Sequence, residues 1–270
     1  MKLGEEFNLH SESHGILLHL GICAFEQREL EKAEKYFLES LQISIDNNDT
    51  QSQGDMLNEL GLVAFEQKEW KKAIVYHEKA LEICRAYNDQ HEQAMSLHNL
   101  GIAFFEMQEW EKAEKCYLEA LEIQISTNDR ISQAKTFHEL GILAQVQSDW
   151  KRAESYYLQA VEIKRELQDY HSLALTLMNL ALAKKGQGKL GESGDILLEI
   201  LEIYVNYDDQ HYVGSNLSSL RDLWRESGDD GLLSGVSKIL RWTEAQVREH
   251  FEKNSEEDTS REENTEKSGG

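Results

Sequence analysis

Residues 58–81, NELGLVAFEQKEWKKAIVYHEKAL, and residues 98–121, HNLGIAFFEMQEWEKAEKCYLEAL, carry the same pattern forty positions apart. Their Leu-Gly dipeptide recurs with this period at Leu20-Gly21, Leu60-Gly61, Leu100-Gly101 and Leu140-Gly141. A fixed period of this size indicates a repeat array, in which each repeat is one supersecondary unit. Further columns keep the same step: Ala33, Ala73, Ala113 and Ala153; Phe37, His77, Tyr117 and Tyr157; Trp70, Trp110 and Trp150; and Asp49, Asp89, Asp129, Asp169 and Asp209.

Each repeat is expected to form two amphipathic helices. In the second repeat, the apolar residues from Met56 to Ala64 are spaced by three and four positions, which is typical of one helical face. The polar residues 67–69 interrupt this pattern, and it resumes on a second helix from Trp70 to Cys84. Small residues such as Gly61 and Ala73 predict the positions where the two helix backbones approach each other closely.

Asn-Asp pairs are expected to separate one repeat from the next. The asparagine of such a pair, for example Asn88, tolerates the left-handed conformation that ends a helix. The aspartate, for example Asp89, can accept a hydrogen bond from the free N–H groups of the following helix. The chain contains no proline, so these polar turns must supply the helix ends.

Charge and cysteine content narrow the possible partners. The net charge of −22 disfavours nucleic acid and anionic membranes, which require a basic surface. A partner protein with basic residues and apolar anchors suits the negative electrostatic potential of the chain better. The three cysteines show no short metal-binding spacing, and their odd number argues against a disulfide framework. Together with an N-terminus that does not look like a signal peptide, they predict a cytoplasmic protein.

The columns of Leu-Gly, Ala and Tyr or Phe resemble the tetratricopeptide repeat. The step of 40 residues exceeds the usual length of about 34 and is similar to a branch that includes spindle-orientation adaptors, kinesin light chains, bacterial peptide sensors and STAND-associated arrays. The resemblance implies an all-α, right-handed α-α superhelix of about five and a half helix-turn-helix repeats, a quasi-one-dimensional scaffold.

The chain is accordingly divided into four segments. Residues 1–10 are expected to be an N-terminal lead, residues 11–230 the repeat array, and residues 231–253 a capping helix that covers the open end of the array. Residues 254–270 contain no apolar residue and predict a disordered acidic tail.

In the resembling family, the first helix of each repeat lines a concave surface that binds a peptide. Carried over column by column, this implies an aliphatic stripe with three phenylalanines beside it, together with asparagines that can bond a peptide backbone. The alternatives are that the apolar side chains are ordinary core and that the asparagines bond a neighbouring helix. The implied partner-binding residues are Ile22, Phe25, Asn58, Glu59, Leu62, Phe65, His98, Asn99, Ile102, Phe105, His138, Glu139, Ile142, Asn179 and Leu182.

Catalytic, metal and cofactor sites are not predicted. His91, His171 and His211 share one repeat column, so they fall on successive repeats and not around one ion. The match to G-x-G-x-x-G at residues 186–191 falls on an expected turn between helices and lacks the strand that a dinucleotide site needs.

The sequence therefore favours a non-enzymatic adaptor or scaffold that binds a peptide or partner protein in its groove. One alternative is a regulatory sensor that recognises a signalling peptide or a foreign protein and changes the shape of its superhelix. Another is a structural assembly component that self-associates.

Overall fold

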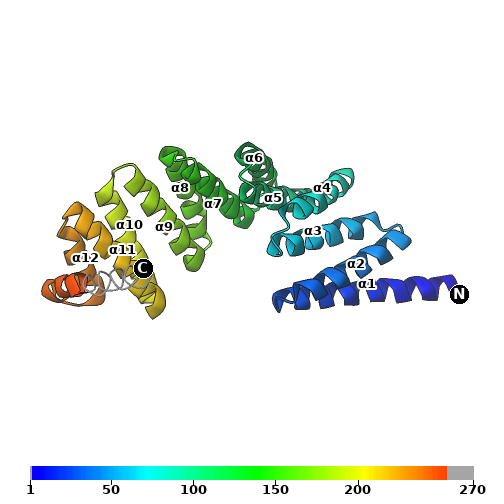
Figure 1. The fold of residues 1–270 in the computed structure, drawn as a ribbon, viewed down its shortest axis with the longest axis horizontal. Coiled ribbons are helices and arrows are strands. Elements are labelled where there is room, and N and C mark those ends of the chain that lie inside the picture. The colour runs from blue at the N-terminus through cyan, green and yellow to red at the C-terminus, as the bar shows by residue number, and fades with distance from the viewer. Residues whose placement is uncertain (1, 254–270) are drawn as a thin grey trace, which may run out of the picture. The chain divides into compact units, whose positions relative to one another are not determined.

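The computed structural model describes residues 2–253, with side chains from His14 onward, and shows an all-helical chain (Figure 1). Its helices are α1 (Lys2–Glu26), α2 (Leu30–Asp46), α3 (Thr50–Glu66), α4 (Trp70–Ala86), α5 (Gln90–Glu106), α6 (Trp110–Ser126), α7 (Arg130–Val146), α8 (Trp150–Glu166), α9 (Tyr170–Gly186), α10 (Leu190–Asn206), α11 (Gln210–Ser227) and α12 (Gly231–Leu240). Residues 244–253 are also helical. The predicted all-α repeat architecture is confirmed.

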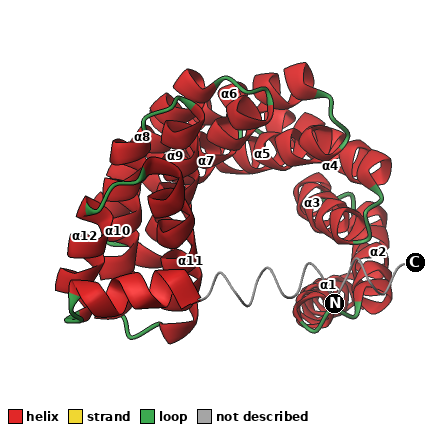
Figure 2. Cartoon of the chain, turned by 60° about the vertical axis from the view of Figure 1, so that its left-hand side comes forward, coloured by secondary structure: helices red, strands yellow, loops and turns green. Residues whose placement is uncertain are grey.

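The chain divides into two compact halves, Met1–Leu143 and Ala144–Gly270, and the boundary lies within α7. Consecutive helices pack against each other from α1 to α6 in the N-terminal half and from α8 to α12 in the C-terminal half. In the N-terminal half, α1, α3 and α5 line the concave side of the row of helices, and α2, α4 and α6 lie on its convex side (Figure 2). In the C-terminal half, α9 and α11 lie along one side of the row of helices, and α8 and α10 lie along the opposite side (Figure 2).

The Leu-Gly column marks a close approach of the two helices in one repeat, as predicted. A Cβ atom built on Gly61 would lie 2.4 Å from the His77 ring, and one built on Gly101 would lie 2.5 Å from the Tyr117 ring. His77 and Tyr117 are both almost fully buried. Glycine and a ring one helix later therefore form one packing unit, which explains why the two columns recur together.

The turns between repeats confirm the two tasks of the Asn-Asp pairs. Asn88 has a φ of 55°, in the left-handed region. The side chain of Asp89 accepts a hydrogen bond from the backbone N–H of Glu92 at 3.1 Å. The turns within repeats use the same left-handed conformation at residues such as Lys68 and Gln108, which the sequence pattern did not reveal.

The two ends of the chain differ from the predicted segments. The helix α1 begins at Lys2, so the segment expected to be a lead continues the first helix. The expected single helix 231–253 is two helices, because Arg241 takes a left-handed φ of 58°. Thr243 and Gln246 then cap the second helix reciprocally, with the Thr243 N–H donating to Gln246 Oε1 and the Gln246 N–H donating to Thr243 Oγ1.

Both C-terminal helices bury apolar side chains. Val236, Val247 and Phe251 have no exposed surface, and the Arg225 guanidinium donates a hydrogen bond to the backbone oxygen of Phe251 at 2.7 Å. The expected disordered tail, residues 254–270, lies outside the described residues. No helix in the part of the chain that the structure describes is long and apolar enough to cross a membrane.

The three cysteines should differ in reactivity. Cys23 is exposed, whereas burial raises the thiol pKa of both Cys84 and Cys116 to about 11, which leaves very little reactive thiolate near neutral pH. We expect a chromogenic disulfide reagent to modify Cys23 quickly in the native protein, and the other two thiols only after unfolding in guanidinium. Cys23→Ser should abolish the fast phase. A fast phase that survives this substitution would contradict the burial of the other two thiols.

Candidate functional site

A cavity of about 430 Å³ opens between helices of the N-terminal half. The helix α3 contributes Leu62, and α5 contributes most of the wall, while α6 and the first turns of α7 complete it. Its lining combines apolar with polar side chains, as small ligand sites do. The lining residues are Leu62, His91, Ala94, Met95, His98, Asn99, Ile102, Gln124, Asp129, Ser132 and Lys135.

Four of the residues predicted from the sequence meet at this cavity, namely Leu62, His98, Asn99 and Ile102. They come together because Leu62 and Ile102 occupy the same column of successive repeats, so stacking of the repeats places them side by side. All four side chains are partly exposed. The cavity therefore offers an aliphatic wall and, next to it, an amide with both a donor and an acceptor.

His98 contributes a neutral imidazole to this wall. Its Nδ1 lies 3.0 Å from Thr136 Oγ1 on α7, and its ring lies 5.7 Å from the Tyr117 ring. Burial, and secondarily the positive charge of Lys135, lowers the pKa of His98 to about 4. A neutral imidazole has one donor and one acceptor nitrogen, so His98 can hold Thr136 and still offer a polar atom.

Gln124 is a lining residue that the sequence analysis missed. Its side chain is 2 % exposed, and its Oε1 has no hydrogen-bond partner among the described residues. A buried acceptor without a partner costs free energy, which a ligand N–H could recover. The corresponding residues in the other repeats are Ser44, Cys84, Lys164 and Tyr204, so the column shows no recurring residue that could have identified it.

At its mouth the cavity carries charges of both signs. Lys135 is exposed, and His91 Nδ1 lies 3.9 Å from Asp129 Oδ2. Although partial burial opposes its ionisation, hydrogen bonds from Ser132 keep the pKa of Asp129 below its usual range. The cavity thus places a carboxylate and an ammonium group next to apolar walls.

Asn58 is removed from the predicted binding surface by its burial. It is 1 % exposed, and its Oδ1 accepts a hydrogen bond from Ser96 Oγ at 2.9 Å and lies 3.2 Å from His77 Nδ1. Its amide nitrogen donates to Glu92 Oε2 at 3.1 Å. The alternative in which an asparagine bonds neighbouring helices therefore applies here, because both ends of the Asn58 amide contact side chains of α4 and α5.

The predicted phenylalanines also serve packing. The Phe65 ring lies 4.8 Å from Trp70, and the Phe105 ring lies 5.2 Å from Trp110, in both cases across the turn within one repeat. Phe25, together with Ile22, packs against the first core cluster. These side chains are half-buried, so the alternative that the apolar side chains are ordinary core applies to them in part.

The other predicted residues lie apart from this cavity. Glu59 is half-buried, and burial, followed by the charges of Glu92 and Asp55, raises its pKa. His138, Glu139 and Ile142 are half-buried on α7 and do not line the cavity. Asn179 and Leu182 line a separate cavity of about 240 Å³ in the C-terminal half.

Among the described residues, no three His, Cys, Asp or Glu side chains are grouped so that they could hold a metal ion. His91 and His171 lie on different halves of the chain. His77 is held by Asn58, and burial lowers its pKa to about 4, so it is a packing residue.

The family model described as tetratricopeptide repeat matches residues 52–126, 92–166 and 132–206, which together span more than half of the chain. No curated protein matches the sequence.

Several solved structures share the fold. A STAND protein with a tetratricopeptide repeat sensor from Pyrococcus horikoshii is 19 % identical with a TM-score of 0.72, covering 89 % of this chain and 38 % of that one. BtubC from P. vanneervenii is 20 % identical with a TM-score of 0.67, covering 78 % and 94 %. A Rap protein complexed with Competence and Sporulation Factor is 17 % identical with a TM-score of 0.65, covering 94 % and 70 %. At these identities the likeness concerns the fold alone.

Proposed function

Because the chain belongs to the tetratricopeptide repeat family, we propose that it is a non-catalytic interaction module that binds an extended peptide segment of a partner protein. The observation that carries this proposal is the cavity of about 430 Å³ in which Asn99 and the unpaired Gln124 Oε1 adjoin the aliphatic side chains Leu62 and Ile102. The amide groups suit a peptide backbone, and the aliphatic wall suits an apolar anchor.

The charge of the chain indicates the character of the partner. With a net charge of −22, the protein attracts basic segments and repels acidic ones. We propose a partner segment with apolar anchors and Lys or Arg residues nearby. The free cysteines fit a cytoplasmic location, where thiols stay reduced.

Substitution of the two lining amides, Gln124 and Asn99, tests this proposal. Gln124→Leu removes the acceptor but also removes an unsatisfied buried polar group, so the fold should keep its stability. We expect a peptide selected on the wild-type protein from a random displayed library to bind Gln124→Leu about five- to tenfold more weakly, the equivalent of one lost hydrogen bond. Asn99→Ala should weaken it similarly. Calorimetric titration of the synthetic peptide measures both effects.

The matched control is Gln42→Leu, the same substitution at an exposed position of α2 away from the cavity. It should leave the affinity unchanged. Peptides that bind Gln124→Leu and Asn99→Ala as tightly as wild type would move the site elsewhere. A library that yields no binder would argue for the self-associating structural role, which light scattering over a range of concentrations measures directly.

The regulatory-sensor alternative differs in its response to ligand. A passive adaptor keeps its dimensions when the selected peptide binds, whereas a sensor changes the radius of gyration in small-angle scattering. One of the similar structures, the Rap protein, was determined in complex with Competence and Sporulation Factor.

A further inference from the structure

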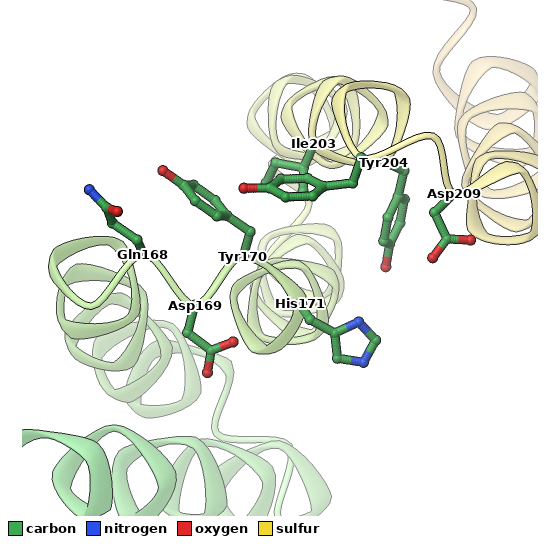
Figure 3. Close-up of a pocket in the computed structure, with 8 residues that line it drawn as sticks. Gln168, Asp169, Tyr170, His171, Ile203, Tyr204 and Asp209 are labelled. Carbon is green, nitrogen blue, oxygen red and sulfur yellow. The ribbon is translucent and has the colours of Figure 1, made fainter.

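A further cavity, of about 560 Å³, lies in the C-terminal half between the start of α9 and the end of α10. Figure 3 shows its lining, with Tyr170 and His171 from the start of α9 and with Ile203 and Tyr204 from the end of α10. Tyr207, Gln168 and the aspartates Asp169 and Asp209 complete it. This cavity shares no residue with the sites predicted from the sequence.

Tyrosine rings dominate the wall of this cavity. The rings of Tyr170 and Tyr207 have centroids 5.3 Å apart and are inclined by 37°. Beside them, Tyr204 stacks on Tyr212 at 5.1 Å, which fixes the Tyr204 ring in place. Tyr207 is 60 % exposed and Tyr170 is 36 % exposed, so both rings present surface to a ligand. The face of such a ring attracts a cation.

Two aspartates supply the negative charge of the lining. Asp169 and Asp209 are the N-caps of α9 and α11, and each accepts a backbone hydrogen bond from the helix that it begins. Hydrogen bonds from Ser172 lower the pKa of Asp169 despite its partial burial, so its carboxylate is ionised at neutral pH. No Lys or Arg is among the residues that line this cavity.

The repeat itself does not require these tyrosines. At the position of Tyr170, the two preceding repeats carry Gln90 and Arg130, and at the position of Tyr204 they carry Gln124 and Lys164. Those repeats form the same helix pairs, so stacking of the repeats is independent of the rings. The aromatic set thus occurs in one repeat only, where it comes together with two carboxylates.

We propose that this cavity binds the side chain of an arginine from a basic peptide, as a second site distinct from the groove of the N-terminal half. Arginine fits because its planar guanidinium stacks on aromatic rings, is weakly hydrated and pairs with carboxylates. In this site the guanidinium contacts Tyr170 and Tyr207, and Asp169 and Asp209 supply the opposite charge. The proposal does not depend on the function of the cavity around Gln124.

The test uses two blocked tripeptides, acetyl-Gly-Arg-Gly-amide and its citrulline counterpart, which is nearly identical in shape but uncharged. Their binding to the full chain is followed by NMR of ¹³C-labelled tyrosine rings, assigned with Tyr170→Phe and Tyr207→Phe. We expect the arginine peptide to shift the Tyr170 and Tyr207 signals saturably, with a dissociation constant on the order of 1 mM, as befits one anchored side chain. The citrulline peptide should leave these signals in place.

The double variant Asp169→Asn/Asp209→Asn removes both charges but keeps the caps, because asparagine caps helices as well as aspartate does. It should raise the dissociation constant of the arginine peptide by about fivefold. Tyr207→Ala should raise it by a similar factor. Tyr87→Ala alters an exposed tyrosine of the same column in the second repeat and should change nothing. Equal binding of the citrulline peptide, undiminished binding to the variants, or the absence of saturable shifts would each overturn the proposal.

Discussion

Gly101→Ala should lower the free energy of unfolding by about 1–3 kcal/mol, the range for overpacking a well-packed core. The new Cβ would lie 2.5 Å from Tyr117 Cδ1, well inside van der Waals contact. Tyr117 has no exposed surface, so its ring has no open space to move into. Alanine favours a helix interior over glycine by about 1 kcal/mol, but the steric conflict outweighs this gain. Urea unfolding followed by far-ultraviolet circular dichroism measures the change.

The matched control has the opposite expected sign. Gly214 lies in α11, is exposed, and has nothing within 4 Å of an added Cβ. Gly214→Ala should therefore stabilise the chain by about 0.5–1 kcal/mol through helix propensity alone. In the double variant Gly101→Ala/Tyr117→Leu, the smaller side chain should relieve the conflict, so that the two substitutions cost less together than the sum of their separate costs. Additive costs would refute the contact as the cause.

The repeat columns predicted the parts of the fold that packing repeats in every unit. The same steric condition recurs in successive repeats, because the glycine must leave room for a ring of the next helix. It applies to Gly61 with His77 and to Gly101 with Tyr117, so it is visible as two columns in the sequence. The same holds for Asp89, whose capping bond recurs at each start of a repeat. The break at Arg241 was not visible, because it occurs once and involves a residue that usually avoids the left-handed region.

The site was predicted less well, because a column fixes the face of a helix but not what covers it. Asn58 and Asn99 are offset by one position relative to Leu-Gly, which is a rotation of about 100° around the helix axis. Asn58 joins a buried network with Ser96, whereas Asn99 lies at the cavity, and so does His98 of the Asn58 column. Predicting this difference needed the position of the next helix.

The repeat columns did not reveal Gln124 or the tyrosines of the C-terminal cavity, for a related reason. Gln124 belongs to a column in which no residue recurs, and its unpaired acceptor depends on its particular neighbours. Tyr170, Tyr204 and Tyr207 stand in three different columns, and only the packing of α9 with α10 brings them to one cavity. Periodicity reveals where the repeats agree, whereas both cavities also depend on residues at which the repeats differ.

Glu154 should make the stability of the chain depend strongly on pH in acid. Its carboxylate accepts hydrogen bonds from Lys184 Nζ at 2.5 Å, Gln187 Nε2 at 2.6 Å and Lys189 Nζ at 3.1 Å. Partial burial works against its ionisation, but these three donors outweigh it and lower the pKa to about 2. Lys184 and Glu154 have side chains only 11 % and 17 % exposed, so solvent screens the pair weakly.

The direction of the pH effect follows from this lowered pKa. A carboxyl group whose pKa is lower in the folded chain than in the unfolded one stabilises the fold at every pH above its unfolded pKa of about 4.3. That stabilisation is lost as the pH falls from there toward the folded pKa of about 2. The difference corresponds to about 3 kcal/mol at neutral pH, because each unit of pKa shift is worth about 1.4 kcal/mol.

Glu154→Gln should therefore lower the free energy of unfolding by up to about 3 kcal/mol at pH 7 and flatten its decline between about pH 5 and pH 2. Lys184→Met should be similarly costly at pH 7, because it leaves a mostly buried carboxylate with weaker partners. The control Glu202→Gln alters an exposed glutamate of α10 and should follow the wild-type profile. Urea titrations at a series of pH values measure all four proteins. If Glu154→Gln keeps the wild-type slope in acid, the acid sensitivity of the fold resides in other carboxylates.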